Sequence, residues 1–472
     1  MRSDLPFQRE AIPDYNGGHQ RGTNRRRTDY VSDLRRAIPM KVPGSFSKNI
    51  DIIGYCDMQD RPAFKMCIQQ RADRWYLYTA HFWHHGWSIV DVTDPANPHV
   101  ERFVEGPDNT ATLQVSLQGE TMVTALEKPL PGFGGDDNAP FEEGVLIWDI
   151  SDPIDPVKLS HWRTGGTGTH RNLYAGGQYA HLAANMAGFK GNIYVILDIS
   201  DRGKPREAGR WWIPGQKEGE TPTSEIVTAR AIASKKYGLT SLSMCGCMGF
   251  CGRPGVDGIS LHGPPYVSSN LAYVPYGAAG LVVLDISDVS RPKEIGRLNF
   301  SPPFHSAFGV HSALPIPERK IAFVSSEDIS YGQGPAHHAS IVDISDPTDP
   351  WLLSVLPQPI PPSGADYPDF HSRGGWCGPH NINHNQYHPD VEKQSDLFYI
   401  AHFNAGLRIY DVANTRLPAE VGYFLPPEPT RRFGPMPQGK LVLQTEDVVV
   451  DRRGYIYISD KNQGVWILRY KR

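Results

Sequence analysis

The sequence lacks the features of several protein classes. Its 472 residues contain no apolar run of 18 or more, so no ordinary transmembrane helix is expected. The net charge is −4, which gives no broad basic surface for nucleic acid. Six cysteines are too few and too unevenly spaced for a disulfide framework in a chain of this length. Residues 1–7 lack the apolar core of a secretory signal, and polar residues 28–33 follow the arginines at 25–27. A cytoplasmic location is predicted.

Familiar catalytic signatures are also absent. The sequence has no Gly-rich phosphate loop, no His-Glu-x-x-His and no Gly-x-Ser-x-Gly. Its 46 glycines, 41 prolines and 39% apolar residues instead suit many short strands joined by tight turns.

A repeated strand-turn-strand unit fills most of the chain. Its clearest copy is Gly-Leu-Val-Val-Leu-Asp-Ile-Ser-Asp at residues 280–288, which a second short strand follows after Pro292. Similar segments begin at residues 86, 144, 193, 339, 406 and 464. A period of roughly 50 to 70 residues indicates blades or solenoid turns.

Seven such units predict an all-β, seven-bladed β-propeller over residues 49–472. The strand at 49–56 resembles the outer strand of a repeat, whereas the last repeat lacks that strand. We therefore expect the N-terminal strand to complete the last blade and close the ring. An open β-solenoid is the alternative, but its repeats would be shorter. Residues 1–48 are predicted to form a polar arm, either solvated or wrapped around another subunit of a homo-oligomer.

One insertion, residues 215–260, interrupts the period between blades 3 and 4. Residues 222–237 predict a helix, so the insertion is a partly helical candidate lid over one channel mouth or an oligomer contact. It also carries three closely spaced cysteines, Cys245, Cys247 and Cys251. These side chains would pack a Gly-rich loop, bind a metal with Cys377 as a candidate fourth ligand, or act in redox chemistry.

Histidines recur in the inner-strand position of four successive blades. They are His170, His262, His311 and His380, and Glu446 lies near the same position in the seventh blade. Because inner strands of a propeller converge on its axis, these side chains are predicted to bind a divalent transition metal: Zn, Fe, Mn or Cu. A wet polar channel and a metal-free general base are the alternatives.

Polar residues at the ends of the second strands supply candidate catalytic groups. The candidates near the same mouth are His81, Tyr276, Glu327 and His402, together with Arg171 beside His170. Such groups would move a proton to or from a bound organic molecule.

The repeat, seen best at residues 280–288 and 144–153, resembles the LVIVD repeat family of predicted β-propeller proteins. The resemblance covers nearly everything from residue 49 onward, and it implies the fold more than the function. At the level of fold the chain is also similar to the selenium-binding protein and methanethiol oxidase group, whose propellers carry inner-strand histidines.

The sequence therefore predicts a metal-dependent enzyme that acts on a small organic molecule by lyase, hydrolase or isomerase chemistry. Oxidoreductase chemistry is an alternative if the metal is iron or copper. A propeller scaffold that binds a protein partner is a hypothesis of a different class, and a binder of sugars or polymers through its tryptophans is a third. No nucleic-acid or membrane partner is expected.

Overall fold

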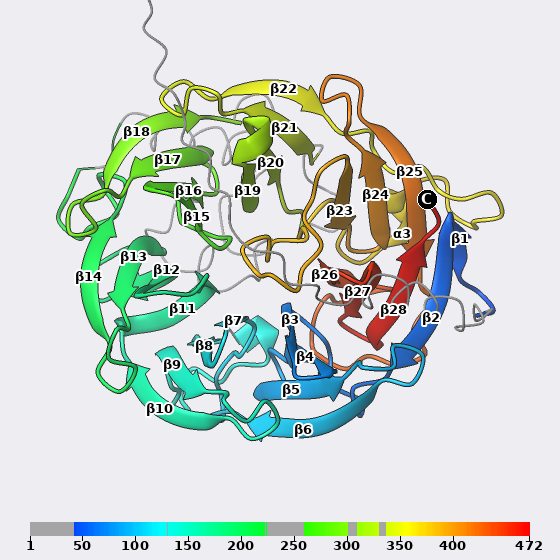
Figure 1. The fold of residues 1–472 in the computed structure, drawn as a ribbon, viewed down its shortest axis with the longest axis horizontal. Coiled ribbons are helices and arrows are strands. Elements are labelled where there is room, and N and C mark those ends of the chain that lie inside the picture. The colour runs from blue at the N-terminus through cyan, green and yellow to red at the C-terminus, as the bar shows by residue number, and fades with distance from the viewer. Residues whose placement is uncertain (1–41, 130, 222, 224–258, 301–308, 330–336) are drawn as a thin grey trace, which may run out of the picture. The chain divides into compact units, whose positions relative to one another are not determined.

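Seven antiparallel sheets surround a common axis (Figure 1). This computed structural model describes residues 42–129, 131–221, 223, 259–300, 309–329 and 337–472, all within one compact unit. Each sheet contains four named strands. The all-β, seven-bladed propeller predicted from the repeats is confirmed.

The first four blades follow the chain from the inner to the outer strand. Blade 1 contains β3 (Met66–Arg71), β4 (Arg74–Ala80), β5 (Gly86–Asp91) and β6 (His99–Glu105). Blade 2 contains β7 (Val115–Gln118), β8 (Thr121–Leu126), β9 (Gly144–Asp149) and β10 (Val157–Trp162). Blade 3 contains β11 (Gly165–Leu173), β12 (Tyr179–Met186), β13 (Ile193–Asp198) and β14 (Arg206–Trp211). Blade 4 contains β15 (Tyr266–Ser268), β16 (Leu271–Pro275), β17 (Leu281–Asp285) and β18 (Lys293–Leu298).

The last three blades vary this plan. Blade 5 contains β19 (Ser312–Ile316), β20 (Ile321–Ser325), β21 (Ala339–Asp343) and β22 (Trp351–Val355). Blade 6 contains β23 (Leu397–Ala401), β24 (Leu407–Asp411), β25 (Ala419–Leu425) and, on the outer edge, β1 (Phe46–Lys48). Blade 7 contains β26 (Thr445–Val450), β27 (Tyr455–Asp460), β28 (Gly464–Tyr470) and β2 (Ile50–Cys56). In blade 6, the inner position is held by a single bridge between Ile382 and Ile400.

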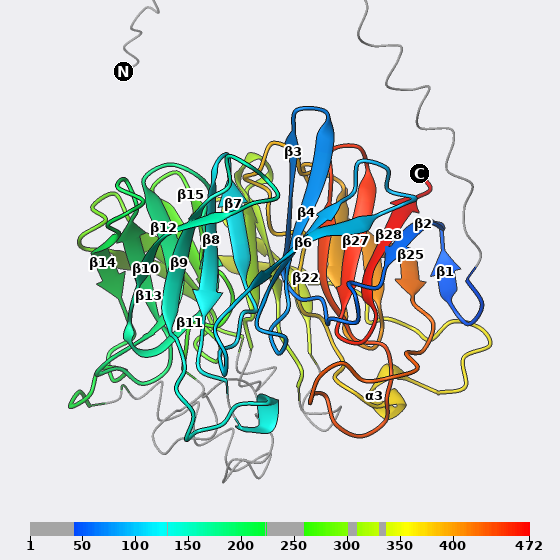
Figure 2. The ribbon, with the colours of Figure 1, turned by 90° about the horizontal axis from the view of Figure 1, so that it is seen from below.

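The described helices are short. They are η1 (Pro131–Phe133), η2 (Pro317–Arg319) and α3 (Phe370–Arg373). Figure 2 shows α3 beyond the strand ends, at one end of the propeller. No described helix has the length and hydropathy needed to cross a membrane.

The Asp-x-Ser-Asp corner of the repeat is a pair of hydrogen-bonded turns. In blade 4, Asp285 Oδ1 accepts from the N–H of Ser287 at 2.8 Å, and Asp288 Oδ1 accepts from the N–H of Ser290 at 3.0 Å. Aspartate favours such turns because its carboxylate caps the backbone two residues ahead. Equivalent bonds follow the third strand at Asp91, Asp149, Asp198, Asp343 and Asp411. The repeated motif therefore ends the third strand of each of these blades.

Glycine is required at two positions of the repeat, for different structural reasons. Gly280 adopts φ +92°, and an added Cβ would lie 2.2 Å from the carbonyl oxygen of Leu298. Gly296 has an ordinary backbone, but its Cβ would lie 2.2 Å from the carbonyl oxygen of Pro347 in the next blade. Glycine at this second position thus allows neighbouring blades to approach closely.

Apolar side chains fill the space between adjacent blades. One buried cluster joins Ile196 of blade 3 to Val274 and Val282 of blade 4. The ring closes where β2 pairs with β28, from Ile50 opposite Tyr470 to Cys56 opposite Val465. The predicted closure by an N-terminal strand is therefore confirmed, and it leaves blade 7 with a full sheet.

Parts of two predicted features fall outside the described residues. Residues 1–41 of the predicted arm are among them, while residues 46–48 form β1 and pair with β25. Most of the predicted helix at 222–237 and the three cysteines Cys245, Cys247 and Cys251 also fall outside.

Candidate functional site

Three of the four predicted histidines share one backbone position. In three blades the histidine N–H donates to the carbonyl oxygen of the last residue of the second strand. These pairs are His262 with Pro275 at 3.1 Å, His311 with Ser325 at 2.7 Å and His380 with Ala401 at 3.0 Å. His170 lies in β11, within a register shift between Thr169 and Asn172. Such irregularities turn side chains out of the regular alternation of a strand.

The four imidazoles form a continuous row. Ring centroids are 4.6 Å apart for His170 and His262, 4.8 Å for His262 and His311, and 4.4 Å for His311 and His380. None of the four residues is more than 1% exposed. The structure thus brings together the four histidines that the repeat predicted to converge.

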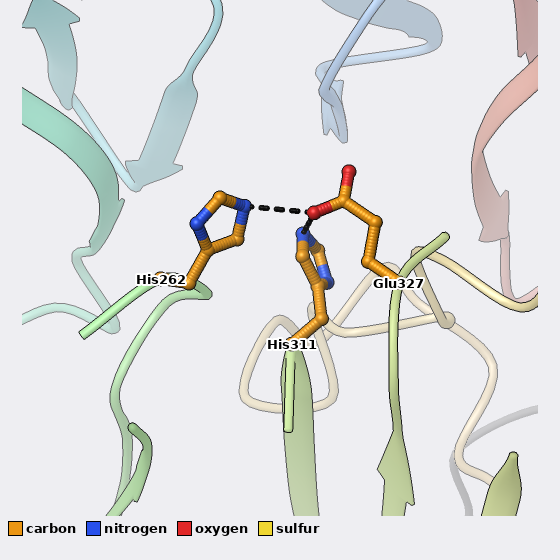
Figure 3. Close-up of side chains that lie close together, drawn as sticks. All are labelled: His262, His311 and Glu327. Atoms are coloured by element: carbon orange, nitrogen blue, oxygen red, sulfur yellow. Dashed lines mark ion pairs between the residues drawn. The ribbon is translucent and has the colours of Figure 1, made fainter. Parts of the chain in front are cut away.

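Glu327 supplies the carboxylate at this row. Its Oε2 lies 3.0 Å from His262 Nε2 and 3.9 Å from His311 Nε2, and its Oε1 lies 3.3 Å from His380 Nε2. Figure 3 shows the imidazoles of His262 and His311 directed toward this carboxylate. A metal held here would therefore have Glu327, not Glu446, as its carboxylate neighbour.

Hydrogen bonds at the Nδ1 atoms orient three of the four imidazole rings. His170 Nδ1 lies 2.8 Å from Glu127 Oε2, His311 Nδ1 2.8 Å from Ser312 Oγ, and His380 Nδ1 2.8 Å from the carbonyl oxygen of Glu446. His311 Nε2 has no hydrogen-bond partner among the described residues. Metal-binding histidines are commonly oriented in this way, with one nitrogen bonded to the protein and the other toward the metal.

The electrostatic environment favours neutral imidazoles. Burial lowers the pKa of His262, and it lowers the pKa values of His170 and His311 far below their ordinary value. Burial alone would raise the pKa of Glu327, but its interactions with His311 and His262 outweigh that effect and hold the pKa well below the ordinary value. Neutral imidazoles beside an ionised carboxylate are the protonation states that bind a divalent cation.

Glu446 approaches the imidazole row from the Nδ1 side of His380, with its Oε2 3.5 Å from that atom. It forms an ion pair with Lys461, and its Oε1 lies 3.3 Å from Arg171 Nη2. Burial would raise the pKa of Glu446, but His380, Lys461 and Arg171 lower it to about 2. Two buried cations thus contact the Glu446 carboxylate, and its role as a metal ligand stays a prediction.

A small cavity lies beside the imidazole row. Its volume of about 20 Å³ is room for about one water molecule. The polar groups on its wall are Arg171, Glu327, His380, Glu446 and Lys461, and the other lining residues are Phe64, Phe82, Trp83, Leu113, Phe133 and Trp376. Nε and Nη1 of Arg171 have no hydrogen-bond partner among the described residues. The cavity therefore combines apolar aromatic walls with an available cationic donor.

Three predicted catalytic residues lie elsewhere. His81 bonds the carbonyl oxygen of Pro62 and the hydroxyl of Ser88, each at 2.6 Å. The hydroxyl of Tyr276 donates to Gln216. His402 lies near the charges of Arg408, His337 and His371. No hydrogen bond, ion pair or ring contact among the described residues joins His81, Tyr276 or His402 to the imidazole row, and their catalytic role stays a prediction.

A one-residue difference in position along the strand separates these three residues from Glu327. The N–H groups of His81, Tyr276 and His402 donate to Gly86, Gly280 and Gly406, and Ser326 donates in the same way to His338. Glu327 is thus one residue beyond the equivalents of His81, Tyr276 and His402. Successive side chains near a strand end point to opposite faces. Asp460 is the equivalent residue in blade 7, and Lys461 lies one residue beyond it. The sequence pattern does not single out Lys461.

The fold and the site together define a seven-bladed β-propeller with a row of buried histidines. The LVIVD repeat family matches residues 167–211, 266–299, 340–355 and 390–425. The chain therefore contains LVIVD repeats, as its sequence resemblance predicted. No curated protein matches the sequence.

Solved structures resemble the chain only distantly. A periplasmic gluconolactonase of Pseudomonas aeruginosa is 12% identical with a TM-score of 0.48, and the match covers 90% of this chain and 99% of that one. A streptogramin B lyase is 9% identical with a TM-score of 0.48, over 90% and 97% of the two chains. A Lactobacillus plantarum protein is 13% identical with a TM-score of 0.47, over 88% and 92%. At these values the likenesses carry no argument about function. The similarity to the selenium-binding protein group stays a prediction.

Proposed function

We propose that this protein is a metal-dependent enzyme whose divalent transition metal is held on the propeller axis by His170, His262, His311 and His380, with Glu327. The observation that carries this proposal is the row of four buried imidazoles with one carboxylate facing three of their Nε2 atoms. Imidazole and carboxylate donors suit Zn, Fe, Mn and Cu.

The bound metal would supply Lewis-acid chemistry, by polarising a carbonyl or lowering the pKa of a water molecule. Arg171 would bind an anionic or developing oxyanion group of the substrate, because two of its donors face no protein acceptor among the described residues. Its pairing with Glu446 at 3.3 Å fixes the guanidinium beside the cavity. The substrate that we propose is a small organic molecule carrying such a group.

The aromatic wall would keep bulk water away from the reacting atoms. Phe82 and Phe133 are each 2% exposed, and Trp376 is 3% exposed. Since the cavity has room for about one water in this conformation, an organic substrate would enter only as these side chains move. Hydrolase, lyase and isomerase reactions all use a polarised carbonyl or an activated water, and the measured metal would decide between them and oxidoreductase chemistry.

The proposal is tested by metal content and turnover. Purified protein is analysed for transition metals beside a His262→Ala/His311→Ala double variant and an outer-strand control, His161→Ala. We expect the double variant to lose one equivalent of metal that the control retains. Metal-loaded wild-type protein should convert a member of a panel of lactones, esters and hydroxy acids that the double variant leaves unchanged.

The scaffold hypothesis makes the opposite prediction. If the propeller only presents a surface to a protein partner, the double variant would keep the metal content of the wild type, and neither protein would turn over any panel member. That outcome would overturn the proposed enzyme. The cytoplasmic location and a homo-oligomer through the N-terminal arm stay predictions.

A further inference from the structure

A second cluster of metal-binding groups lies at the end of the propeller that carries α3. It contains Asp328 after β20, His337 before β21, His371 in α3 and Cys377 after α3. Cys377 Sγ is 3.2 Å from Asp328 Oδ2 and 3.4 Å from His371 Nδ1. His337 Nε2 is 3.5 Å from the same Asp328 oxygen. The donor atoms of Asp328, His371 and Cys377 thus lie within 4.8 Å of one another, and His337 approaches the Asp328 carboxylate.

Three separations between donor atoms are in the range found around a tetrahedral metal ion. With metal–ligand lengths of about 2.0 to 2.3 Å, neighbouring ligand atoms around tetrahedral zinc lie about 3.3 to 3.6 Å apart. The three observed distances are 3.2, 3.4 and 3.5 Å. Sulfur, imidazole nitrogen and carboxylate oxygen are also the donor types of zinc sites. The geometry needs little rearrangement to accept an ion.

His337 gives an independent indication of a ligand. The residue is only 5% exposed, and neither ring nitrogen has a hydrogen-bond partner among the described residues. A buried polar atom without a partner costs about 1 to 3 kcal/mol of free energy, and a bound ion or water is one way to offset that cost. The Nε2 atom of His337 lies 3.5 Å from Asp328 Oδ2, so an ion on that carboxylate would supply its partner.

Access to the cluster is provided by His371. This residue is exposed, whereas Asp328 and Cys377 are each 1% exposed. The first turn of α3 is fixed by Asp369, whose Oδ1 accepts from the N–H of Ser372 at 2.7 Å. An ion could therefore enter from solvent beside α3, at a helix turn whose backbone is already ordered.

The third metal-compatible group of the described residues is already paired with a cation. Asp91, His99 and Glu101 lie together, but Arg74 contacts both carboxylates, Glu101 at 2.7 Å. That cation occupies the position an ion would take.

We propose that Cys377, His371, Asp328 and His337 bind a divalent zinc-type cation in a site separate from the axial row. Four protein ligands would close the coordination sphere, which is typical of structural rather than catalytic zinc. The ion would tie α3 and Cys377 to the segments that flank β20 and β21. This proposal does not rest on the proposed enzymatic function, because the two sites share no ligand.

Cobalt substitution separates the two sites. Cobalt bound to a thiolate absorbs through sulfur-to-metal charge transfer, and the axial row contains no sulfur. Apo-protein is titrated with Co²⁺ for the wild type, Cys377→Ser, His371→Ala and a control at another buried cysteine, Cys56→Ser. We expect the charge-transfer band in the wild type and Cys56→Ser, its loss in Cys377→Ser, and at least a tenfold weaker titration in His371→Ala.

Further variants make each outcome decisive. The axial double variant His262→Ala/His311→Ala should keep the band, so that failure of the axial proposal leaves this one testable. His371→Ala changes an exposed residue, and its thermal unfolding checks that the fold is intact. A band that persists in Cys377→Ser would assign the thiolate to another cysteine and overturn the proposal. Absence of the band in the wild type, with rapid metal-independent alkylation of Cys377, would overturn it in favour of a thiol–imidazole nucleophile.

Discussion

Glu327 and Asp328 are consecutive in the chain, yet their carboxylates face two different clusters. Glu327 Oε2 lies 3.0 Å from His262 Nε2, whereas Asp328 Oδ2 lies 3.2 Å from Cys377 Sγ. The segment directly follows Ser326, whose N–H still bonds the carbonyl oxygen of His338. Because side chains alternate between the two faces of such a segment, one peptide unit can serve both clusters.

Isosteric changes at these two positions should therefore affect different ions. Glu327→Gln removes the charge that faces the imidazoles, and we expect the axial metal to bind about 10- to 100-fold more weakly. The same variant should keep the cobalt–thiolate band. Asp328→Asn should show the reverse pattern. Chelator competition and cobalt spectra measure the two effects, and equal weakening of both ions by either variant would contradict two separate sites.

The fold was predictable because its determinants are local. Asp285 and Asp288 each accept a hydrogen bond from the backbone two residues ahead. The turn after the third strand is therefore determined by residues that are close together in the sequence. The four histidines were also predictable, because they share one position of a repeat. The strand at Ile50–Cys56 was recognised as the missing strand of the last blade for the same reason.

The remaining features of the two clusters could not be predicted from the spacing of the repeat. The side chains of Glu327 and Lys461 face the cavity beside the imidazole row because each is one residue beyond a predicted strand end, and a one-residue step reverses the direction of a side chain. Glu446 in blade 7 contacts Arg171 in blade 3 and Lys461 after β27, and the spacing of the repeat does not predict these contacts. The cluster around Cys377 is assembled from segments outside the repeat, so spacing could not reveal it.

A side chain at Gly296 should disrupt the packing between blades 4 and 5, an effect that β-strand propensity does not predict. A Cβ at this position would lie 2.2 Å from the carbonyl oxygen of Pro347, a backbone atom that cannot move aside alone. We expect Gly296→Ala to lower the free energy of unfolding by about 1 to 3 kcal/mol, as for other overpacked sites. Gly132→Ala is the control, because its Cβ would meet nothing within 4 Å. Equal urea midpoints for the two variants would refute the argument.

Acid should destabilise the protein through buried histidines away from the imidazole row. Burial lowers the pKa of His81 from about 6.5 to about 3. Between these values the unfolded chain binds the proton and the folded chain does not, so the stability that His81 contributes is complete above pH 6.5 and falls as the pH drops. The slope approaches about 1.4 kcal/mol per pH unit.

Urea unfolding between pH 7.5 and 5 tests this contribution. We expect His81→Asn to be less stable than the wild type at pH 7.5 but to lose less stability on acidification, so the two curves converge. His99→Gln, at an exposed outer-strand position, should run parallel to the wild type. A parallel curve for His81→Asn would mean that folding does not lower the pKa of His81.

The buried pair of Lys461 and Glu446 should contribute to stability as a unit. Their side chains are 1% and 2% exposed, and Lys461 also lies 4.6 Å from the ring centroid of Phe403. Removing one partner leaves the other charge buried, so Lys461→Met should cost about 3 kcal/mol in unfolding free energy. The cost would be near the low end for such pairs, because Arg171 still neutralises Glu446.

A double-mutant cycle distinguishes this coupling from simple loss of packing. In Lys461→Met/Glu446→Gln neither charge remains, so we expect the double variant to recover more than about 1 kcal/mol relative to Lys461→Met. Lys471→Met is the matched control at an exposed pair, where Lys471 Nζ lies 2.7 Å from Asp51 Oδ1, and it should change stability by less than about 1 kcal/mol. Additive costs in the cycle would show that Glu446 is stabilised by Arg171 and His380 alone, and that Lys461 acts only through its aromatic neighbours.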